Sequence, residues 1–142
     1  MQTNVDPKKI AAYEATTFWV QGREGVDFAL RLGQCSPELL DLYKETQTLS
    51  AVFITAYNPF GEVREASVNK EANRRLLAHL QDISAHVFPG HGGDPDQEWP
   101  PEPSFLALGM TEEAAHSAGL LFQQDAVLWA GEDGVPSLQL LR

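Results

Sequence analysis

The feature that most constrains the fold is an apolar segment, residues 49–57, with the sequence Leu-Ser-Ala-Val-Phe-Ile-Thr-Ala-Tyr. Alternating polar and apolar residues are typical of a strand with one face in water, whereas a nearly continuous apolar run is typical of a strand covered on both faces. Asn58 and Pro59 follow at once, and proline cannot continue a central strand. We therefore predict a central strand that ends in a polar turn at Asn58.

Shorter segments with helix or strand signatures lie on both sides of this strand. Cap residues followed by proline or by an amphipathic pattern predict helices, and β-branched, aromatic or apolar runs predict strands. The predicted helices are 6–14, 36–46, 65–84 and 111–122, and the other predicted strands are 16–20, 28–32, 104–108, 126–130 and 137–141. Since helices and strands interleave, we expect one α/β domain over residues 1–142, with an α+β arrangement as the alternative. Its core is a single-layer mixed β-sheet of about six strands with helices packed on it.

Residues 89–103 are rich in Gly, Pro and Asp and predict one long loop. Loops of this length are uncommon in compact domains unless they are functional or mobile. Trp99 is expected either to anchor this loop or to offer a stacking surface to a ligand. Trp19 and Trp129 fall in strand patterns and are expected in the core. We expect Cys35 there too, because it has no activating neighbour in the sequence.

The charge of the chain disfavours some partners. Its net charge is −10 and it has no block rich in Lys or Arg, which disfavours nucleic acid and membrane surfaces. With Cys35 as the only cysteine, neither an intramolecular disulfide nor a cysteine zinc cage can form. The first residues lack the pattern of a signal peptide, and no apolar run approaches the roughly 18 residues of a membrane span. We expect a cytoplasmic protein.

Polar residues gather where the central strand should end. Asn69 and Asn73 share one face of the predicted helix 65–84 with Leu76, Leu80 and Ile83, and this face should point inward towards Asn58. A buried amide without a partner costs about 1–3 kcal/mol. The partners are either Asn58 and nearby backbone or the polar edge of a ligand, and the pattern leaves both open.

Glu102 lies between Pro101 and Pro103, so its backbone is stiff. A fixed carboxylate beside amides can act as a general acid or base, although an acid on a surface loop is the simpler alternative. Thr55 and Ser104 carry hydroxyls on predicted buried strands, where a bond to backbone is their ordinary role. No G-x-S-x-G motif surrounds Ser104.

Neither a metal nor a cofactor is expected. His86 and His91 are followed by Asp94, Asp96 and Glu98, but their spacing matches no metal-binding motif. Residues 90–93, Gly-His-Gly-Gly, lack the lysine of a phosphate-binding loop, and the acidic residues beside them would repel phosphate.

Five motifs in chain order support a resemblance that spans nearly the whole chain: Tyr13-x-x-Thr16, Phe53-Ile-Thr-Ala-Tyr-Asn-Pro59, Asn69-x-x-x-Asn73, Trp99-Pro-Pro-Glu-Pro-Ser-Phe105 and Phe122-Gln-Gln124-x-Ala126. Together they resemble a bacterial family known only as domain-of-unknown-function family 3293. The matching polar positions are Thr55, Asn58, Asn69, Glu102, Ser104 and Gln124. The family tends towards glycine where this chain has Gln123, which leaves the local backbone there in question. The resemblance implies no activity, but its polar motif residues favour a shared pocket over a purely structural domain.

We therefore expect a small polar ligand, similar to a nucleotide, a sugar or an amino acid, in a pocket of amides and one carboxylate. The expected binding residues are Thr55, Asn58, Asn69, Asn73, Ser104 and Gln124. Glu102 is the candidate general acid or base if a reaction occurs, and hydrolysis or group transfer is then the broad class. The alternative is a non-catalytic acidic module that engages a basic protein through residues 89–103.

Overall fold

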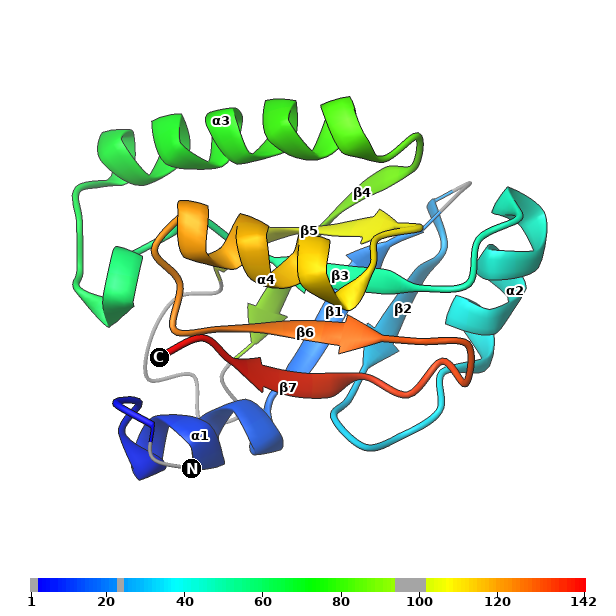
Figure 1. Cartoon of the computed structure of the whole chain (residues 1–142), viewed down its shortest axis with the longest axis horizontal. Helices are drawn as coiled ribbons and strands as arrows, with labels where there is room; N and C mark the ends of the chain where they lie inside the picture. The colour runs from blue at the N-terminus through cyan, green and yellow to red at the C-terminus, as the bar shows by residue number, and fades with distance from the viewer. Residues whose placement is uncertain (1–2, 23–24, 94–101) are drawn as a thin grey trace.

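The structure is a computed structural model that describes residues 3–22, 25–93 and 102–142. The helices in these ranges are α1 (Pro7–Ala15), α2 (Pro37–Thr46), α3 (Ala66–Ile83) and α4 (Glu112–Leu121), and a 3-10 turn, η2 (Pro59–Gly61), precedes α3. The strands are β1 (Thr17–Gln21), β2 (Asp27–Leu30), β3 (Ala51–Ile54), β4 (Val87–Gly93), β5 (Glu102–Leu108), β6 (Ala126–Ala130) and β7 (Ser137–Leu140). Figure 1 shows these helices packed around one curled sheet.

The sheet has the strand order β2-β1-β4-β5-β3-β6-β7. This arrangement confirms the predicted α/β fold with helices packed on a single sheet. The described strands number seven, one more than expected. Every pairing among them is antiparallel, although a mixed sheet was expected.

The additional strand is β4, which begins before residue 89 and occupies part of the predicted loop. Gly90 pairs with Val20 of β1 and with Ser104 of β5. A Cβ atom at Gly90 would lie 2.3 Å from the carbonyl oxygen of Trp19, so the glycine permits the close approach of β1. The loop prediction over 89–103 was therefore wrong for 89–93 and for 102–103. Residues 94–101, including Trp99, lie outside the described residues, and a role of this segment in protein binding stays a prediction.

Strand β3 is buried on both faces, as predicted. Ala51 and Phe53 belong to the core beneath α2, and Val52 and Ile54 to the core beneath α3 and α4. The strand is shorter than the predicted 49–57. The amide nitrogen of Ala56 donates to a side chain of α3, which draws the chain out of the sheet.

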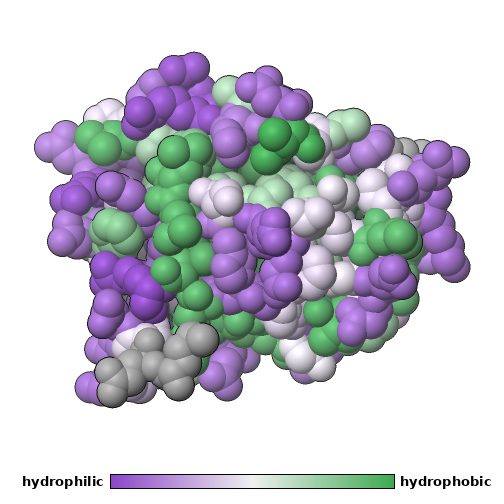
Figure 2. All heavy atoms as spheres, in the orientation of Figure 1, coloured by the Kyte–Doolittle hydropathy of each residue, from purple (hydrophilic) through white to green (hydrophobic). Residues whose placement is uncertain are grey.

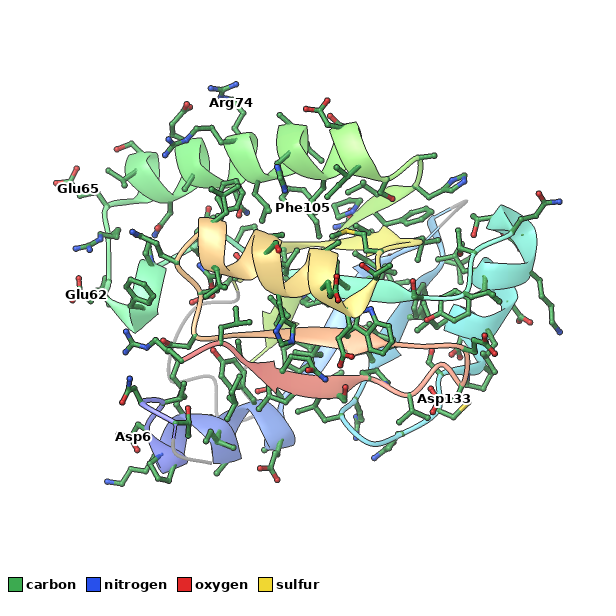
Figure 3. All side chains as sticks on the ribbon, viewed as in Figure 1. Asp6, Glu62, Glu65, Arg74, Phe105 and Asp133 are labelled. Carbon is green, nitrogen blue, oxygen red and sulfur yellow. The ribbon has the colours of Figure 1, made fainter. Side chains whose placement is uncertain are left out.

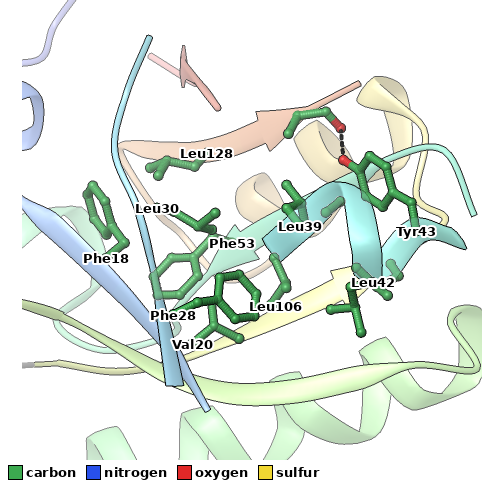
Figure 4. Packing of buried hydrophobic residues seen from close by; sticks show 13 residues of the cluster. Phe18, Val20, Phe28, Leu30, Leu39, Leu42, Tyr43, Phe53, Leu106 and Leu128 are labelled. Atoms are coloured by element: carbon green, nitrogen blue, oxygen red, sulfur yellow. Dashed lines mark hydrogen bonds between the residues drawn. The ribbon is translucent and has the colours of Figure 1, made fainter. Parts of the chain in front are cut away.

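The core beneath α2 is built from aromatic and aliphatic side chains of the sheet (Figure 4). The rings of Phe18 and Phe53 meet edge to face, with their centroids 5.4 Å apart. The hydroxyl of Tyr43 donates to the carbonyl oxygen of Ala130 at 3.2 Å, which ties α2 to β6. Burial raises the pKa of Tyr43, and the negative charge of Asp133 acts in the same direction, so this hydroxyl keeps its proton.

Three residues that were expected inside are exposed. Ile83 is the last residue of α3, beyond the inward positions Leu76 and Leu80, and is 48% exposed. Trp19 is 40% exposed because Phe18 and Val20 point into the core and side chains alternate along a strand. Cys35, just before α2, is exposed as well.

Trp129 lies at the core as expected, half-buried against the α3 and α4 side, and its indole nitrogen donates to the carbonyl oxygen of Met110 at 2.9 Å. Hydrophilic side chains cover the outer side of α3, while apolar ones gather near the C-terminal end of α4, where Leu120 and Leu121 are exposed (Figure 2). None of the described helices is both long and apolar enough to span a membrane.

Candidate functional site

The turn after β3 contains an unusual concentration of left-handed backbone. Asn58 and Phe60 have φ angles of 46° and 54°, and Gly61 follows with 76°. The amide nitrogen of Phe60 donates to the carbonyl oxygen of Gln123 at 2.7 Å, and Gln123 itself has φ 57°. A left-handed conformation costs most residues other than glycine about 1–2 kcal/mol, and it costs asparagine less. Three left-handed residues other than glycine, Asn58, Phe60 and Gln123, therefore lie where η2 contacts the end of α4.

The backbone of Gln123 is left-handed at the position where the family resemblance implied glycine. At φ 57° glycine has no steric penalty, whereas any other side chain is disfavoured. The local backbone at Gln123, which the sequence left open, is therefore left-handed, a conformation for which glycine is suited.

Two buried amides of α3 hold this turn. Asn69 Oδ1 accepts from the amide nitrogen of Asn58, and Asn69 Nδ2 donates to Asn58 Oδ1, both at 2.9 Å. Asn73 Oδ1 accepts from the amide nitrogen of Ala56 at 2.8 Å, and its Nδ2 donates to the carbonyl oxygen of Pro103 at 2.9 Å. The expectation that Asn69 reaches back to Asn58 is confirmed, while Asn73 reaches Ala56 and Pro103 instead. Both amides thus find protein partners, and ligand contact by either stays a prediction.

Thr55, Ser104 and Gln124 also bond to backbone near the turn. Thr55 Oγ1 donates to the carbonyl oxygen of Pro103 at 2.7 Å, and Ser104 Oγ donates to that of Glu102 at 2.9 Å. Gln124 Nε2 donates to the carbonyl oxygens of Tyr57 and Phe122, each at 3.2 Å. The structure therefore brings all the predicted polar positions together around the turn and the start of β5.

Glu102, the first residue of β5, is half-buried beside Asn58. Its Oε1 accepts from Asn58 Nδ2 at 3.4 Å, which is long for a hydrogen bond. Burial raises the pKa of the Glu102 carboxyl above its ordinary value, while the Asn58 amide and the charge of Lys9 act in the opposite direction. A carboxyl with a raised pKa is better suited than an ordinary glutamate to give and take protons near neutral pH.

An ion-pair cluster that the sequence did not predict lies beside this carboxyl. Asp125, whose side chain is only 4% exposed, pairs through Oδ2 with the ammonium group of Lys9 in α1. The guanidinium Nε of Arg142 lies 2.6 Å from Asp125 Oδ1, close enough for an ion pair but without the alignment of a hydrogen bond. The backbone of Gly61 lies directly against the Lys9 ammonium group, because a Cβ atom at Gly61 would lie 2.6 Å from Lys9 Nζ. Figure 1 shows α1, η2 and the end of β7 at one end of the molecule.

Tyr13 of α1 completes the cluster. Burial raises its pKa strongly, and the negative charges of Asp125 and Glu102 add to the effect. The Tyr13 hydroxyl therefore stays protonated and can act as a hydrogen-bond donor towards these carboxylates or towards a ligand.

Some of these residues carried a signal in the sequence. Tyr13 opens one of the matching motifs, and Asp125 fills the unspecified position between Gln124 and Ala126. Lys9 and Arg142 belong to no motif. Because Lys9 is 116 residues from Asp125, only the fold brings that pair together. Among the described residues, no group of His, Cys, Asp and Glu has the arrangement of a metal site.

Comparison with known proteins gives one match. The model of the family described as "Protein of unknown function (DUF3293)" matches residues 54–127, just over half of the chain. The match includes the turn at Asn58, the α3 amides, Glu102 and Asp125, whereas Lys9, Tyr13 and Arg142 lie outside it. No curated protein and no solved structure matches the chain. The chain belongs to the DUF3293 family of proteins of unknown function.

Proposed function

We propose that this protein binds a small polar molecule beside Glu102 and Asn58, at the end of the sheet where the Lys9–Asp125 pair and Tyr13 also lie. A carboxyl, an amide, a phenol and an ammonium group there come from separate segments of the chain. Together these groups can accept hydrogen bonds from a ligand and donate hydrogen bonds to it, which suits a ligand similar to a nucleotide, a sugar or an amino acid.

The observation that carries this proposal is the environment of Glu102. The carboxyl is half-buried and its pKa is raised. Within the described part of the chain, its side-chain hydrogen bond comes from Asn58 Nδ2 at 3.4 Å. Burying a carboxyl in this way lowers stability unless something compensates. A ligand that donates to Glu102 would supply that compensation.

The remaining predicted residues support the site in this proposal. Asn69 fixes Asn58, Asn73 ties the end of β3 to the start of β5, and Gln124 holds the backbone of Tyr57. Thr55 and Ser104 brace the same backbone. Three residues held in a left-handed conformation beside this framework agree with a functional role, since such conformations cluster at ligand sites.

If the bound molecule reacts, Glu102 is the group that we assign to proton transfer. Its raised pKa favours a carboxylic acid that protonates a leaving group or, once ionised, a base that accepts a proton. Hydrolysis or group transfer is the class of reaction that this role fits.

A thermal-shift screen against nucleotides, sugars and amino acids tests the proposal, using the unchanged protein, Glu102→Gln and Glu132→Gln. Glu132 is an exposed carboxylate next to Asp133, which lies at the opposite end of the molecule from Glu62 and Asp6 (Figure 3). We expect at least one compound to raise the melting temperature of the unchanged protein and of Glu132→Gln, and to raise that of Glu102→Gln much less. The proposal fails if no compound stabilises the protein, or if Glu102→Gln responds as fully as the other two.

We also propose a cytoplasmic setting in a bacterial cell. The lone cysteine and the acidic net charge of −10 agree with a protein that acts without disulfides. Fractionation of the host cell tests this proposal, and recovery of the protein outside the cytoplasm would contradict it.

A further inference from the structure

The ion-pair cluster holds more positive than negative charge. Among the described residues, Lys9 and Arg142 form ion pairs with a single buried carboxylate, Asp125, which neutralises one of the two cations. Glu102, the other carboxyl on which Lys9 acts, forms an ion pair with neither cation. Their side chains are 34% and 38% exposed, so both remain within reach of solvent. In a chain with a net charge of −10, such a local excess of cations needs an explanation beyond the general composition.

Arg142 is placed like an anion-binding arginine. Its guanidinium carbon lies 4.6 Å from the centroid of the Phe60 ring, so the group stacks on an aromatic face while Nε faces Asp125. No described residue hydrogen-bonds to its two η nitrogens, and these form the edge that binds a carboxylate or phosphate in a bidentate manner. The ring that supports it belongs to Phe60, one of the left-handed residues of the turn.

Lys9 is held beside the same position. Its ammonium group lies between Asp125 and the backbone of Gly61, where a larger residue would collide with it. Against the effect of burial, the charge of Lys9 also acts to lower the pKa of Glu102, so the ammonium group is near enough to act on Glu102 as well as on Asp125. Lys9 therefore connects the ion-pair cluster to the Glu102–Asn58 pair.

Building on the proposed function, we infer that the ligand carries an anionic group, a carboxylate or a phosphate, that binds to Lys9 and Arg142 while its polar part faces Glu102 and Asn58. This narrows the ligand class to acids such as phosphorylated nucleosides or sugars, sugar acids and amino acids. Uncharged sugars and nucleosides then bind weakly, because they leave the excess cation without a partner.

Titration of the ¹⁵N-labelled full chain with inorganic phosphate, and separately with acetate, tests the inference at constant ionic strength maintained with chloride. The resonances to follow are the amides of Phe60 and Gly61 and the side-chain Nε–H of Arg142. We expect saturable shifts at these positions with at least one of the two anions. Lys9→Met should weaken binding by about tenfold, as expected for the loss of one charge-assisted contact. Lys9→Arg should restore most of it.

Lys8→Met is the matched control, because Lys8 is the exposed neighbour of Lys9 on the same helix. It should bind both anions as the unchanged protein does. Arg142→Gln is a second variant that leaves Asp125 paired with Lys9, and it should also weaken binding. The amide spectrum of each variant shows whether the fold is retained.

The outcomes separate this inference from the proposed function. If uncharged compounds stabilise the protein through Glu102 while phosphate and acetate cause no saturable shift, the anion site is refuted and the proposed function stands. If anions bind equally well to Lys9→Met and to Arg142→Gln, the anion site is refuted as well. If the anions bind as expected but no polar compound depends on Glu102, the anion site stands and the proposed function fails.

Discussion

Asn69 holds Asn58 through two hydrogen bonds of 2.9 Å each: the backbone nitrogen of Asn58 donates to Asn69 Oδ1, and Asn69 Nδ2 donates to Asn58 Oδ1. A single buried amide on α3 thus fixes both the backbone and the side chain of the residue that immediately precedes η2. The orientation of the Asn58 amide towards Glu102 depends on this contact.

Asn69→Ala should lower the free energy of unfolding by about 2–3 kcal/mol, because Asn69 is buried and its hydrogen bonds to Asn58 and to the carbonyl oxygen of Arg64 are lost. Urea denaturation measures the loss. Gln81→Ala is the control, since Gln81 is an exposed amide on the same helix and its replacement should change stability by less than about 0.5 kcal/mol. Equal effects of the two substitutions would show that Asn69 does not hold the turn.

Gln123→Gly should stabilise the protein, by about 0.5–1 kcal/mol, because glycine adopts φ 57° without the steric penalty of a side chain. Gln81→Gly, in the last turn of α3, should instead lower stability, since glycine destabilises a helix by up to about 1 kcal/mol. Thermal unfolding of both variants checks the pair. A lower melting temperature for Gln123→Gly would contradict the role assigned to the left-handed backbone.

Gly61→Ala should destabilise the protein for two reasons. Its φ of 76° is unfavourable for alanine, and the added Cβ atom would lie 2.6 Å from Lys9 Nζ. Gly33→Ala separates these causes, because Gly33 has φ 77° but nothing within 4 Å of an added Cβ atom. We expect Gly33→Ala to cost about 1–2 kcal/mol from the backbone alone and Gly61→Ala to cost more. Equal losses would mean that Lys9 moves aside freely and is not confined by the turn.

The pKa of Glu102 predicts a pH dependence of stability. Because burial raises this pKa in the folded state above the ordinary value of 4.5, folding favours the protonated carboxyl. Its contribution to stability is fully present below the ordinary pKa and is lost as the pH rises through the folded-state pKa. Glu102→Gln removes this titration, so its stability relative to the unchanged protein should increase from pH 4 to pH 8.

Urea midpoints of the unchanged protein, Glu102→Gln and Glu132→Gln across this pH range measure the effect. The curve of the exposed-carboxylate control should stay close to that of the unchanged protein. Parallel curves for the unchanged protein and Glu102→Gln would contradict a raised pKa.

Much of the fold follows from local sequence patterns. The apolar run 49–57 predicted a buried central strand, and Ser36-Pro37 and Thr111 predicted the starts of α2 and α4 correctly. Strand β4 was missed because Pro89 and three glycines signal a loop. Those glycines are tolerated in a strand that is paired on both sides, and Gly90 in particular permits the approach of β1. Sequence patterns do not report such pairing.

Some residues of the candidate site could also be predicted from local sequence patterns, and others could not. Asn58 could be identified because it follows the apolar run, and Asn69 because it shares a helix face with apolar residues. Glu102 could be identified because a proline flanks it on each side. The Lys9–Asp125 and Arg142–Asp125 pairs join segments distant in the chain, so no local pattern indicates them. The left-handed state of Phe60 also had no signal, because bulky residues rarely adopt it.

Binding of a small polar molecule beside Glu102 can be measured by calorimetric titration of the best compound from the screen into the unchanged protein, Glu102→Gln and Glu132→Gln. We expect one-site binding to the unchanged protein and to Glu132→Gln with the same Kd. For Glu102→Gln we expect a Kd about tenfold or more weaker, as for the loss of a charge-assisted contact. An unchanged Kd in Glu102→Gln would show that the ligand binds elsewhere and would contradict a site at Glu102.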